Sequence, residues 1–198
     1  MGREGCTDLF EVMGRRRSVR SYLPDPVAEG DLNKIIEAAC SAPSAGNLQA
    51  YRIVVVRDPE TRRRLADACW GQRFIAEAPV SLVFLSDPAV SARRYGSRGA
   101  ELYSLQDATI ACAFAMLAAH ALGYGTCWVG AFNDGAVLRA VGALGVGLRP
   151  VAVLTVGKPR APPGTTGRRP VEEIVALDTL DRPFPYSASG PRLRRPDM

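Results

Sequence analysis

Residues 123–132 read Gly-Tyr-Gly-Thr-Cys-Trp-Val-Gly-Ala-Phe and follow the longest helical pattern of the chain. The glycines at the start of this stretch end the helix, and residues 126–129 are expected to form a short extended segment. Glycines beside an extended turn allow backbone N–H groups to lie close to a planar ligand. Taken alone, the stretch fits either a ligand site or a glycine-rich turn in a core.

Hydrophobic periodicity predicts the elements on either side of this stretch. Helices are expected over residues 8–16, 29–40, 59–70, 74–77, 98–122 and 134–142, and strands over 51–56, 80–85, 126–129 and 150–156. Helices and strands that do not alternate strictly favour an α+β fold over a doubly wound sheet. Neither a Gly-x-Gly-x-x-Gly after a strand nor a Walker motif occurs, so no Rossmann or P-loop nucleotide site is expected. We expect a single domain over residues 1–181 and a proline- and arginine-rich tail over 182–198.

The composition is that of an ordinary globular protein, with 47% hydrophobic and 23% charged residues among 198. No apolar run reaches the roughly 18 residues that span a bilayer, and the polar N-terminal residues do not resemble a signal peptide. We therefore expect a cytoplasmic protein without membrane contact. The formal net charge of +5 comes almost entirely from arginine, since lysine occurs only at Lys34 and Lys158. An arginine excess fits a phosphate-bearing cofactor, a nucleic acid or codon bias.

The sequence gives little support for metal-dependent or acid–base chemistry. None of the five cysteines forms a Cys-x-x-Cys pair, which argues against zinc, iron–sulfur and thioredoxin-like sites. The single histidine, His120, lies in an alanine-rich helical stretch, where packing or an interface explains it better than catalysis. We expect no metal site and no catalytic side chain, so difficult chemistry would come from a bound organic cofactor.

Two further clusters are candidates for contact with such a cofactor. Residues 16–20 read Arg-Arg-Ser-Val-Arg, and guanidinium groups beside a hydroxyl form a candidate phosphate receptor. A solvated basic run is the alternative for this cluster. Residues 42–49 read Ala-Pro-Ser-Ala-Gly-Asn-Leu-Gln, in which Asn47 and Gln49 carry amides suited to the edge of a flat ring. A plain loop between a helix and a strand is the alternative for the second cluster.

The order of these clusters resembles the nitroreductase family. Arg-Arg-Ser-x-Arg comes first, then Pro-Ser-x-x-Asn-x-Gln before a strand, then a long helix ending in Gly-x-Gly-Thr-Cys-Trp-x-Gly-x-Phe. Residues 156–159 (Val-Gly-Lys-Pro) and 167–173 (Gly-Arg-Arg-Pro-Val-Glu-Glu) are similar to the closing segment of that family. The resemblance spans about residues 9–176, which is most of the chain.

The resemblance implies an α+β fold with a central antiparallel or mixed sheet flanked by helices. It also implies an intertwined homodimer with one FMN in each of two interface sites. The resemblance also implies, by position, which residues bind FMN. The phosphate, ribityl chain and pyrimidine edge would be bound by Arg16, Arg17, Ser18 and Arg20, and the phosphate also by Arg168 and Arg169. One side of the isoalloxazine would meet Pro43, Ser44, Ala45 and Asn47 from the partner subunit, and the opposite side would meet Trp128, Val129 and Gly130. Which of Arg168 and Arg169 meets the phosphate stays open.

The implied activity is a ping-pong transfer of hydride from NADH or NADPH through FMN to a small, flat electron acceptor of the nitroaromatic or quinone type. Arg20 is the candidate for electrostatic stabilisation of the reduced ring, because arginine keeps its proton at physiological pH. The chain departs from some relatives at Val129, where they carry Glu, and at residues 72–74, where they carry Lys. These departures leave the acceptor and the preference between NADH and NADPH open.

Three alternatives remain at this stage. The chain could be a specialised member of the same superfamily that destroys flavin, removes halogen or oxidises a peptide. It could bind FMN without turnover. It could also bind nucleic acid through its arginines, but aromatic residues are not interleaved with the clusters, and only Tyr22 lies near the first one. We therefore expect no nucleic-acid partner.

Overall fold

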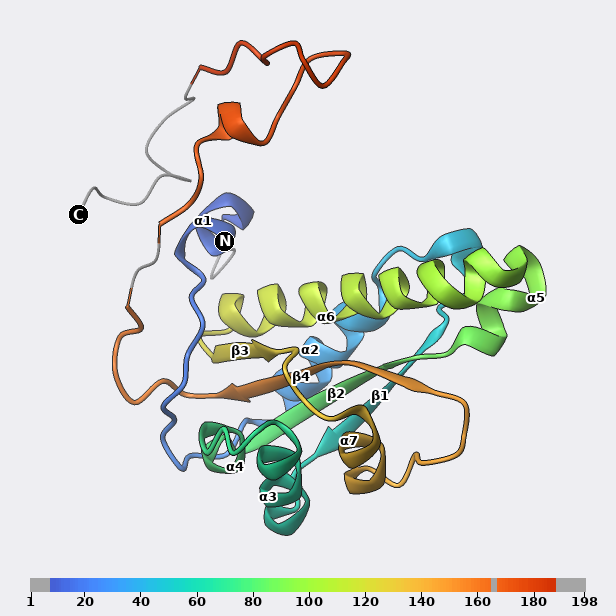
Figure 1. Cartoon of the computed structure of the whole chain (residues 1–198). Coiled ribbons are helices and arrows are strands. Elements are labelled where there is room, and N and C mark those ends of the chain that lie inside the picture. The colour runs from blue at the N-terminus through green and yellow to red at the C-terminus, as the bar shows by residue number, and fades with distance from the viewer. Residues whose placement is uncertain (1–7, 165–166, 188–198) are drawn as a thin grey trace, which may run out of the picture. The chain divides into compact units, whose positions relative to one another are not determined.

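The computed structural model describes residues 8–164 and 167–187 (Figure 1). The chain divides into two compact units, which are described separately: one is Arg16–Pro163 and the other consists of the two ends of the chain. In the described part of the second unit, α1 (Leu9–Arg15) confirms the helix predicted near the N-terminus, and η3 (Val171–Glu173) is a single 3-10 turn. The predicted boundary between a domain and a tail at residue 182 stays a prediction, and residues 188–198 of that tail lie outside the described residues.

An antiparallel sheet forms the centre of the first unit. Within the described residues it has four strands in the order β1-β2-β4-β3. The strands are β1 (Tyr51–Val56), β2 (Val80–Ser86), β3 (Gly125–Val129) and β4 (Arg149–Gly157). A single parallel bridge between Ser18 and Thr126 places the segment after Arg16 along β3. The predicted α+β fold with a central sheet and flanking helices is confirmed.

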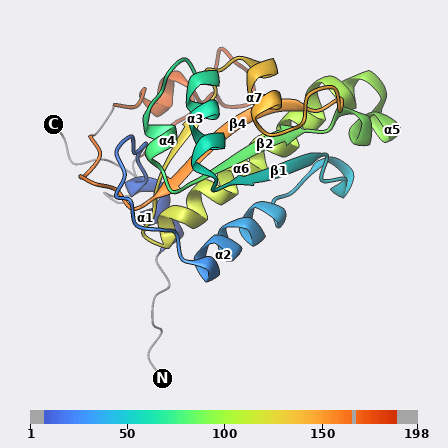
Figure 2. The same cartoon turned by 90° about the horizontal axis from the view of Figure 1, so that it is seen from below.

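Helices cover both faces of this sheet (Figures 1 and 2). On one face lie α2 (Glu29–Cys40) and α6 (Ser104–Ala121); on the other lie α3 (Pro59–Ala68), α4 (Phe74–Glu77) and α7 (Asp134–Ala140). Strand β2 contributes side chains to the hydrophobic layers on both faces of the sheet, because successive side chains of a strand point to opposite faces. Leu82 and Phe84 pack in the layer with α6, and Val83 and Leu85 pack in the layer with α3. The hydrophobic run of β2 is thus that of a strand buried on both faces.

The helix predicted over residues 98–122 begins earlier than the sequence pattern indicated. An additional helix, α5 (Pro88–Arg98), precedes it and continues through a π-helical turn, η2 (Gly99–Tyr103), into α6. The side chain of Asp87 caps α5 by accepting a hydrogen bond from the backbone N–H of Val90 at 3.3 Å. The Asp-Pro pair at residues 87–88 is therefore the start signal that the prediction missed.

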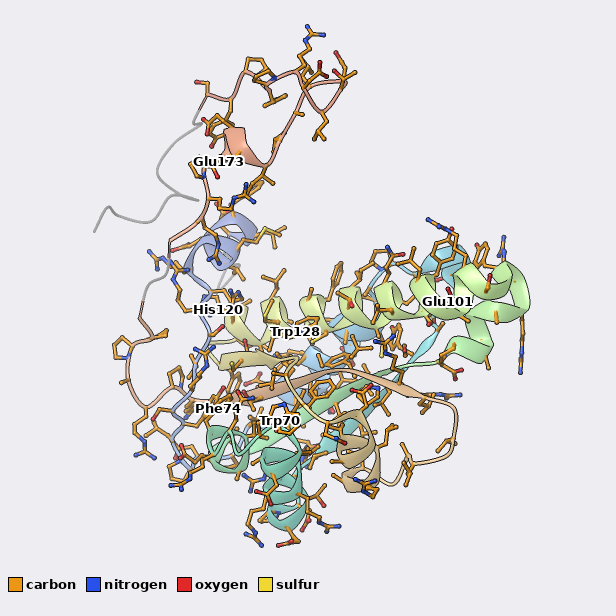
Figure 3. All side chains as sticks on the ribbon, in the orientation of Figure 1. Trp70, Phe74, Glu101, His120, Trp128 and Glu173 are labelled. Carbon is orange, nitrogen blue, oxygen red and sulfur yellow. The ribbon has the colours of Figure 1, made fainter. Side chains whose placement is uncertain are left out.

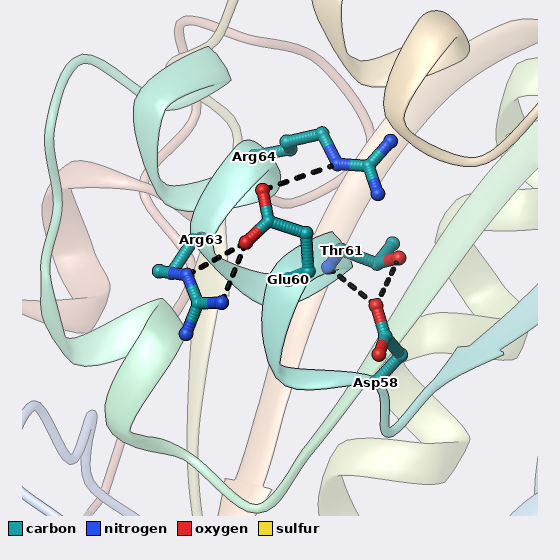
Figure 4. A network of polar contacts seen from close by, with 5 residues as sticks. All are labelled: Asp58, Glu60, Thr61, Arg63 and Arg64. Atoms are coloured by element: carbon teal, nitrogen blue, oxygen red, sulfur yellow. Dashed lines mark hydrogen bonds and ion pairs between the residues drawn. The ribbon is translucent and has the colours of Figure 1, made fainter.

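The start of α3 uses the same capping chemistry (Figure 4). The carboxylate of Asp58 accepts hydrogen bonds from the backbone N–H and the hydroxyl of Thr61, both at 2.7 Å. These hydrogen bonds lower the pKa of Asp58, because they favour its charged form. Glu60 pairs with Arg63 and Arg64 one turn further along the helix. Together these contacts begin α3 at Pro59, as the sequence predicted.

The continuous helical run from Pro88 to Ala121 is long and apolar enough to cross a membrane by length and composition alone. The core helix of a globular protein passes the same test. Ala111, Ala115 and Ala119 of α6 are fully buried against the sheet and α2. The expectation of no membrane contact stays a prediction.

Candidate functional site

The basic cluster at residues 16–20 runs beside the glycine-rich stretch at 123–132. The backbone N–H of Val19 donates to the carbonyl oxygen of Thr126 at 2.9 Å. Val19 is buried, whereas Ser18 and Arg20 are exposed. In an extended segment, residues two apart share a side, so the Ser18 hydroxyl and the Arg20 guanidinium face the same way. The structure thus brings the first and third sequence clusters together.

A buried hydroxyl anchors this segment to the sheet. The Tyr22 hydroxyl donates to the carbonyl oxygen of Val19 at 2.7 Å and lies 2.6 Å from Oγ1 of Thr155. That Thr155 oxygen also accepts from the backbone N–H of Cys127 at 3.2 Å. Burial raises the pKa of Tyr22, so the phenol stays protonated. These three hydrogen bonds therefore fix the position of the segment that contains Ser18 and Arg20.

Close packing explains why residue 125, the second glycine of the glycine-rich stretch, is glycine. A Cβ atom at Gly125 would lie 2.6 Å from Cγ2 of Val19 and 2.9 Å from Cγ of Pro159. Both distances are too short for ordinary carbon contacts, so only glycine lets the basic segment approach β3 this closely.

Positive charge gathers around Cys127. Burial raises the pKa of its thiol, and the nearby guanidinium groups of Arg20 and Arg16 oppose that rise. Hydrogen bonds from Ser18 and Arg20 act in the same direction as the guanidinium groups. Among the described residues, Arg20 forms no ion pair with a carboxylate. An electropositive cradle of this kind suits an anionic ligand.

The loop at residues 43–49 is built around η1 (Ala45–Asn47) and has an unusual backbone. Gly46, Asn47 and Gln49 adopt φ values of 58°, 57° and 47°, in the left-handed region. Asp107 of α6 supports the loop by accepting hydrogen bonds from the backbone N–H groups of Ala45 at 2.9 Å and Ala50 at 3.3 Å. Left-handed residues other than glycine cost energy and cluster at ligand sites, where the surrounding structure holds them in place.

Within one chain, this loop lies far from the basic cluster. Asp107 holds the loop near the start of α6, whereas the glycine-rich stretch follows the end of α6. Figure 3 shows Glu101, just before α6, and His120, in its last turn, at opposite ends of the helical run. From Asp107 to Ala121, α6 covers about 20 Å at 1.5 Å per residue. The structure therefore does not bring Pro43, Ser44, Ala45 and Asn47 to the other candidate residues of the same chain.

Comparison with known proteins identifies the family. The model of the nitroreductase family matches residues 13–73 and 70–158, which is most of the chain. The chain belongs to the nitroreductase family. A protein of Archaeoglobus fulgidus named for NADH dehydrogenase or NAD(P)H nitroreductase activity is 32% identical over 125 residues, which are 63% of this chain and 68% of that protein.

Other relatives of this nitroreductase-family chain match over a smaller part of their length. An NADH dehydrogenase of Thermus thermophilus is 59% identical over 73 residues, covering 37% of this chain and 36% of that protein. An FMN reductase [NAD(P)H] of Bacillus subtilis is 35% identical over 135 residues, covering 63% of this chain and 54% of that protein.

Solved structures of the family share the fold. The hypothetical oxidoreductase YcnD of Bacillus subtilis superimposes with a TM-score of 0.80 at 29% identity, covering 88% of this chain and 75% of that one. The NADPH:FMN oxidoreductase of Vibrio harveyi, solved with NAD+, superimposes with a TM-score of 0.79 at 25% identity, covering 86% of this chain and 77% of that one.

The end of β3 carries the third set of candidate residues of this nitroreductase-family member. Trp128 is half-buried, and Gly130 is exposed directly after the strand. The side chain of Val129 is buried in the core with α3 and α7. Any contact of Val129 with a ligand is therefore made by its backbone.

Arg168 and Arg169 belong to the second unit, which is described by itself. Arg169 pairs with the Glu173 carboxylate at 3.1 Å and also donates to the Glu173 carbonyl oxygen at 3.3 Å. Arg168 donates to the carbonyl oxygen of Gly167 at 3.2 Å. Their predicted role at a phosphate stays a prediction.

Two features of the site region were absent from the sequence prediction. The first is Asp107, a buried carboxylate near the start of α6 whose partners come from a distant loop. The second is a group of arginine and tyrosine side chains on α5 and η2 beside the 43–49 loop. The described residues contain no group of three or more metal-ligating side chains, and the expectation of no metal site stays a prediction.

Proposed function

We propose that this chain is an FMN-dependent oxidoreductase that takes hydride from NADH or NADPH and passes it to a small, flat electron acceptor of the nitroaromatic or quinone type. The observation that carries the proposal is the Arg20 guanidinium, which forms no ion pair with a carboxylate among the described residues and lies beside Ser18 on a segment held against β3. FMN carries a phosphate and a flat ring, which match the anion-binding cradle and the glycine-rich strand end. The names of the Bacillus and Vibrio relatives, which include FMN, support the same cofactor.

Each candidate FMN-binding residue has a proposed role toward the cofactor. Arg16, Arg17, Ser18 and Arg20 bind its phosphate, ribityl chain and pyrimidine edge, joined by Arg168 or Arg169 of the second unit. Pro43, Ser44, Ala45 and Asn47 of the partner subunit meet one side of the ring, and Trp128, Val129 and Gly130 line the other. Backbone groups of Val129 and Gly130 serve here, since one side chain is buried and the other is absent.

The separation of the clusters along α6 supports the proposed homodimer. If two copies pack their α6 helices side by side in opposite directions, the 43–49 loop of each copy reaches the basic cluster of the other. Residues 110–119 of α6 are all apolar, and Phe114 remains exposed although the opposite side packs in the core. A helix that is apolar on all sides is stable in water only when every side is covered, so a second copy is the proposed cover.

Bound FMN would supply the redox chemistry by accepting hydride from the nicotinamide and donating it to the acceptor. The Arg20 guanidinium holds a fixed positive charge near the pyrimidine edge, where negative charge develops on reduction. The chain supplies no acid–base pair in this proposal, and none is needed for hydride transfer. Donor and acceptor would bind in turn at the cofactor, which predicts ping-pong kinetics.

The visible spectrum of the purified protein tests the proposal, together with mass spectrometry of the compound released by heat. We expect a flavin spectrum, FMN in the released fraction, and bleaching by NADH or NADPH without oxygen. A colourless protein that takes up no FMN in excess would contradict the proposal. Flavin binding without bleaching would instead indicate a non-catalytic FMN-binding protein, and a substrate panel separates specialised activities of the superfamily. We also propose a cytoplasmic location, without membrane or nucleic-acid partners.

A further inference from the structure

Four side chains on α5 and η2 form what we call the arginine–tyrosine cluster: Arg94, Tyr95, Arg98 and Tyr103. The two tyrosine rings meet edge to face, with centroids 5.2 Å apart and an interplanar angle of 83°. The Arg94 guanidinium carbon lies 5.4 Å from the centre of the Tyr95 ring, and that of Arg98 lies 5.5 Å from the centre of the Tyr103 ring. Nε of Arg98 also donates to the Tyr103 hydroxyl at 2.9 Å. The rings therefore hold the two cations in place.

The charge of this cluster is not neutralised within the described residues. Neither Arg94 nor Arg98 forms an ion pair there, and Arg93 adds another exposed guanidinium on the same helix. The nearby carboxylates are Glu101, which is exposed and unpaired in the same residues, and Asp87, which faces Arg52 at 3.6 Å. Arginine offers a planar fork of donors that matches phosphate, and a guanidinium stacked on an aromatic ring is preorganised for that task.

The backbone that carries the arginine–tyrosine cluster is irregular at two places. Gly96 interrupts α5 with φ 56° and ψ −143°, and the π-helical turn η2 follows it. A Cβ atom at Gly99 would lie 2.5 Å from the carbonyl oxygen of Ser91, so the turn closes tightly on α5. Single π-helical turns inside helices occur often at functional sites. Gly96 lies between Tyr95 and Arg98, and Tyr103 is the last residue of η2, yet the rings of Tyr95 and Tyr103 remain in contact.

The cluster lies directly against the 43–49 loop. Nη1 of Arg94 is 3.4 Å from the carbonyl oxygen of Gly46 and donates to it. A Cβ atom at Gly46 would overlap the Tyr95 hydroxyl. In the proposed function, this loop meets the isoalloxazine ring of the FMN held by the partner subunit. A ligand lying on that ring and longer than the ring itself would therefore reach the cluster.

We propose that the arginine–tyrosine cluster binds the adenosine-phosphate half of NADH or NADPH while the nicotinamide lies on the flavin. This inference rests on the proposed function. Guanidinium groups would contact the phosphate, and the half-buried tyrosine rings offer flat apolar surface to the adenosine. A nitroaromatic or quinone acceptor lacks this half, so the cluster distinguishes the electron donor from the acceptor at a shared ring.

Kinetics with a shortened donor test this inference. Reduced nicotinamide mononucleotide carries the same hydride as NADH but lacks the adenosine-phosphate half. In the FMN-loaded wild type we expect kcat/KM for NADH to exceed that for the mononucleotide. In the double variant Arg94→Gln, Arg98→Gln, that ratio should fall about tenfold, because the phosphate loses its hydrogen bonds to charged groups. Arg139→Gln, an exposed arginine on α7, is the matched control and should keep the wild-type ratio.

Calorimetric titration with ADP-ribose provides a readout that is independent of turnover. Wild type and Arg139→Gln should bind ADP-ribose, and the double variant should bind it at least about tenfold more weakly. An unchanged donor ratio in the double variant, with flavin still bound and reduced, would overturn this inference and leave the proposed function standing. A wild type that holds no flavin would overturn both.

Discussion

The carboxylate of Asp107 on α6 accepts a hydrogen bond from the backbone N–H of Ala45 at 2.9 Å, and so ties the longest helix to the loop proposed to meet the flavin. The second oxygen of the same carboxylate accepts from the backbone N–H of Ala50 at 3.3 Å. Asp107 is almost fully buried. The carboxylate in that position satisfies two backbone donors that would otherwise be unpaired.

Replacing this carboxylate should cost stability and loosen the loop. We expect Asp107→Ala to lower the free energy of unfolding by about 2–4 kcal/mol, because a buried and a part-buried N–H group lose their carboxylate acceptor. Urea denaturation measures the change. Asp134→Ala, at the exposed first turn of α7, should cost less than about 1 kcal/mol. Equal decreases in the free energy of unfolding in the two variants would show that the Asp107 hydrogen bonds do not stabilise the fold more than an exposed carboxylate does.

Gly46 should tolerate substitution less well than another glycine with a similar backbone. Gly46→Ala meets two penalties: φ is 58°, and the new Cβ would overlap the Tyr95 hydroxyl. Gly142 has φ 69° with nothing within 4 Å, so Gly142→Ala reports the backbone penalty alone, about 1 kcal/mol. In thermal unfolding, the melting temperature of Gly46→Ala should be lower than that of Gly142→Ala. Introducing Tyr95→Phe beside Gly46→Ala should recover part of the difference, and no recovery would refute the overlap as its cause.

Arg20 should set the reduction potential of the bound flavin. Removing its charge in Arg20→Ala should lower the potential, because the reduced ring loses a neighbouring cation. Arg20→Lys keeps the charge and should restore most of the potential. Spectroelectrochemistry measures both variants against wild type. A potential that is the same in all three proteins would remove Arg20 from this role, even if FMN still binds.

The buried thiols should make the protein less stable in alkali. Burial raises the pKa of Cys69 to about 12 from an ordinary value near 9, so between these pH values the folded protein keeps a proton that the unfolded chain releases. The free energy of unfolding should therefore fall as pH rises above about 9, and be insensitive to this thiol below that. Cys69→Ala should flatten the fall in urea denaturation, whereas Cys40→Ala, an exposed thiol, should leave it unchanged. A slope unaffected by Cys69→Ala would contradict this assignment.

Local patterns predicted most elements of the fold. The strand at residues 51–56 and the helix at 29–40 begin and end where apolar periodicity placed them, because each buries a regular face. The start of α5 was missed because its signal was one capping Asp-Pro pair rather than a hydrophobic pattern. Capping chemistry is short and easily overlooked, although it decides where a helix begins.

The site was predictable only in part. The resemblance assigned the basic cluster and the glycine-rich stretch to one cofactor, which stays a prediction, and the Val19–Thr126 hydrogen bond shows that the two segments are adjacent. Asp107 and the arginine–tyrosine cluster act through contacts between distant segments, which no local pattern reveals. Sequence alone also could not show that the 43–49 loop lies at the other end of α6, since that separation arises from the tertiary fold.

The central claim is that each flavin site takes its basic cluster from one chain and its 43–49 loop from the other. Mixed dimers test this directly. One chain carries Arg20→Glu and the other carries Ser44→Tyr, each chosen to abolish flavin binding in its own homodimer, and the two chains bear different affinity tags. In the mixed dimer, one site then contains both changes and the other contains neither. We predict one FMN for each mixed dimer, and a mixed dimer without FMN would contradict the claim, because sites formed within single chains would all remain defective.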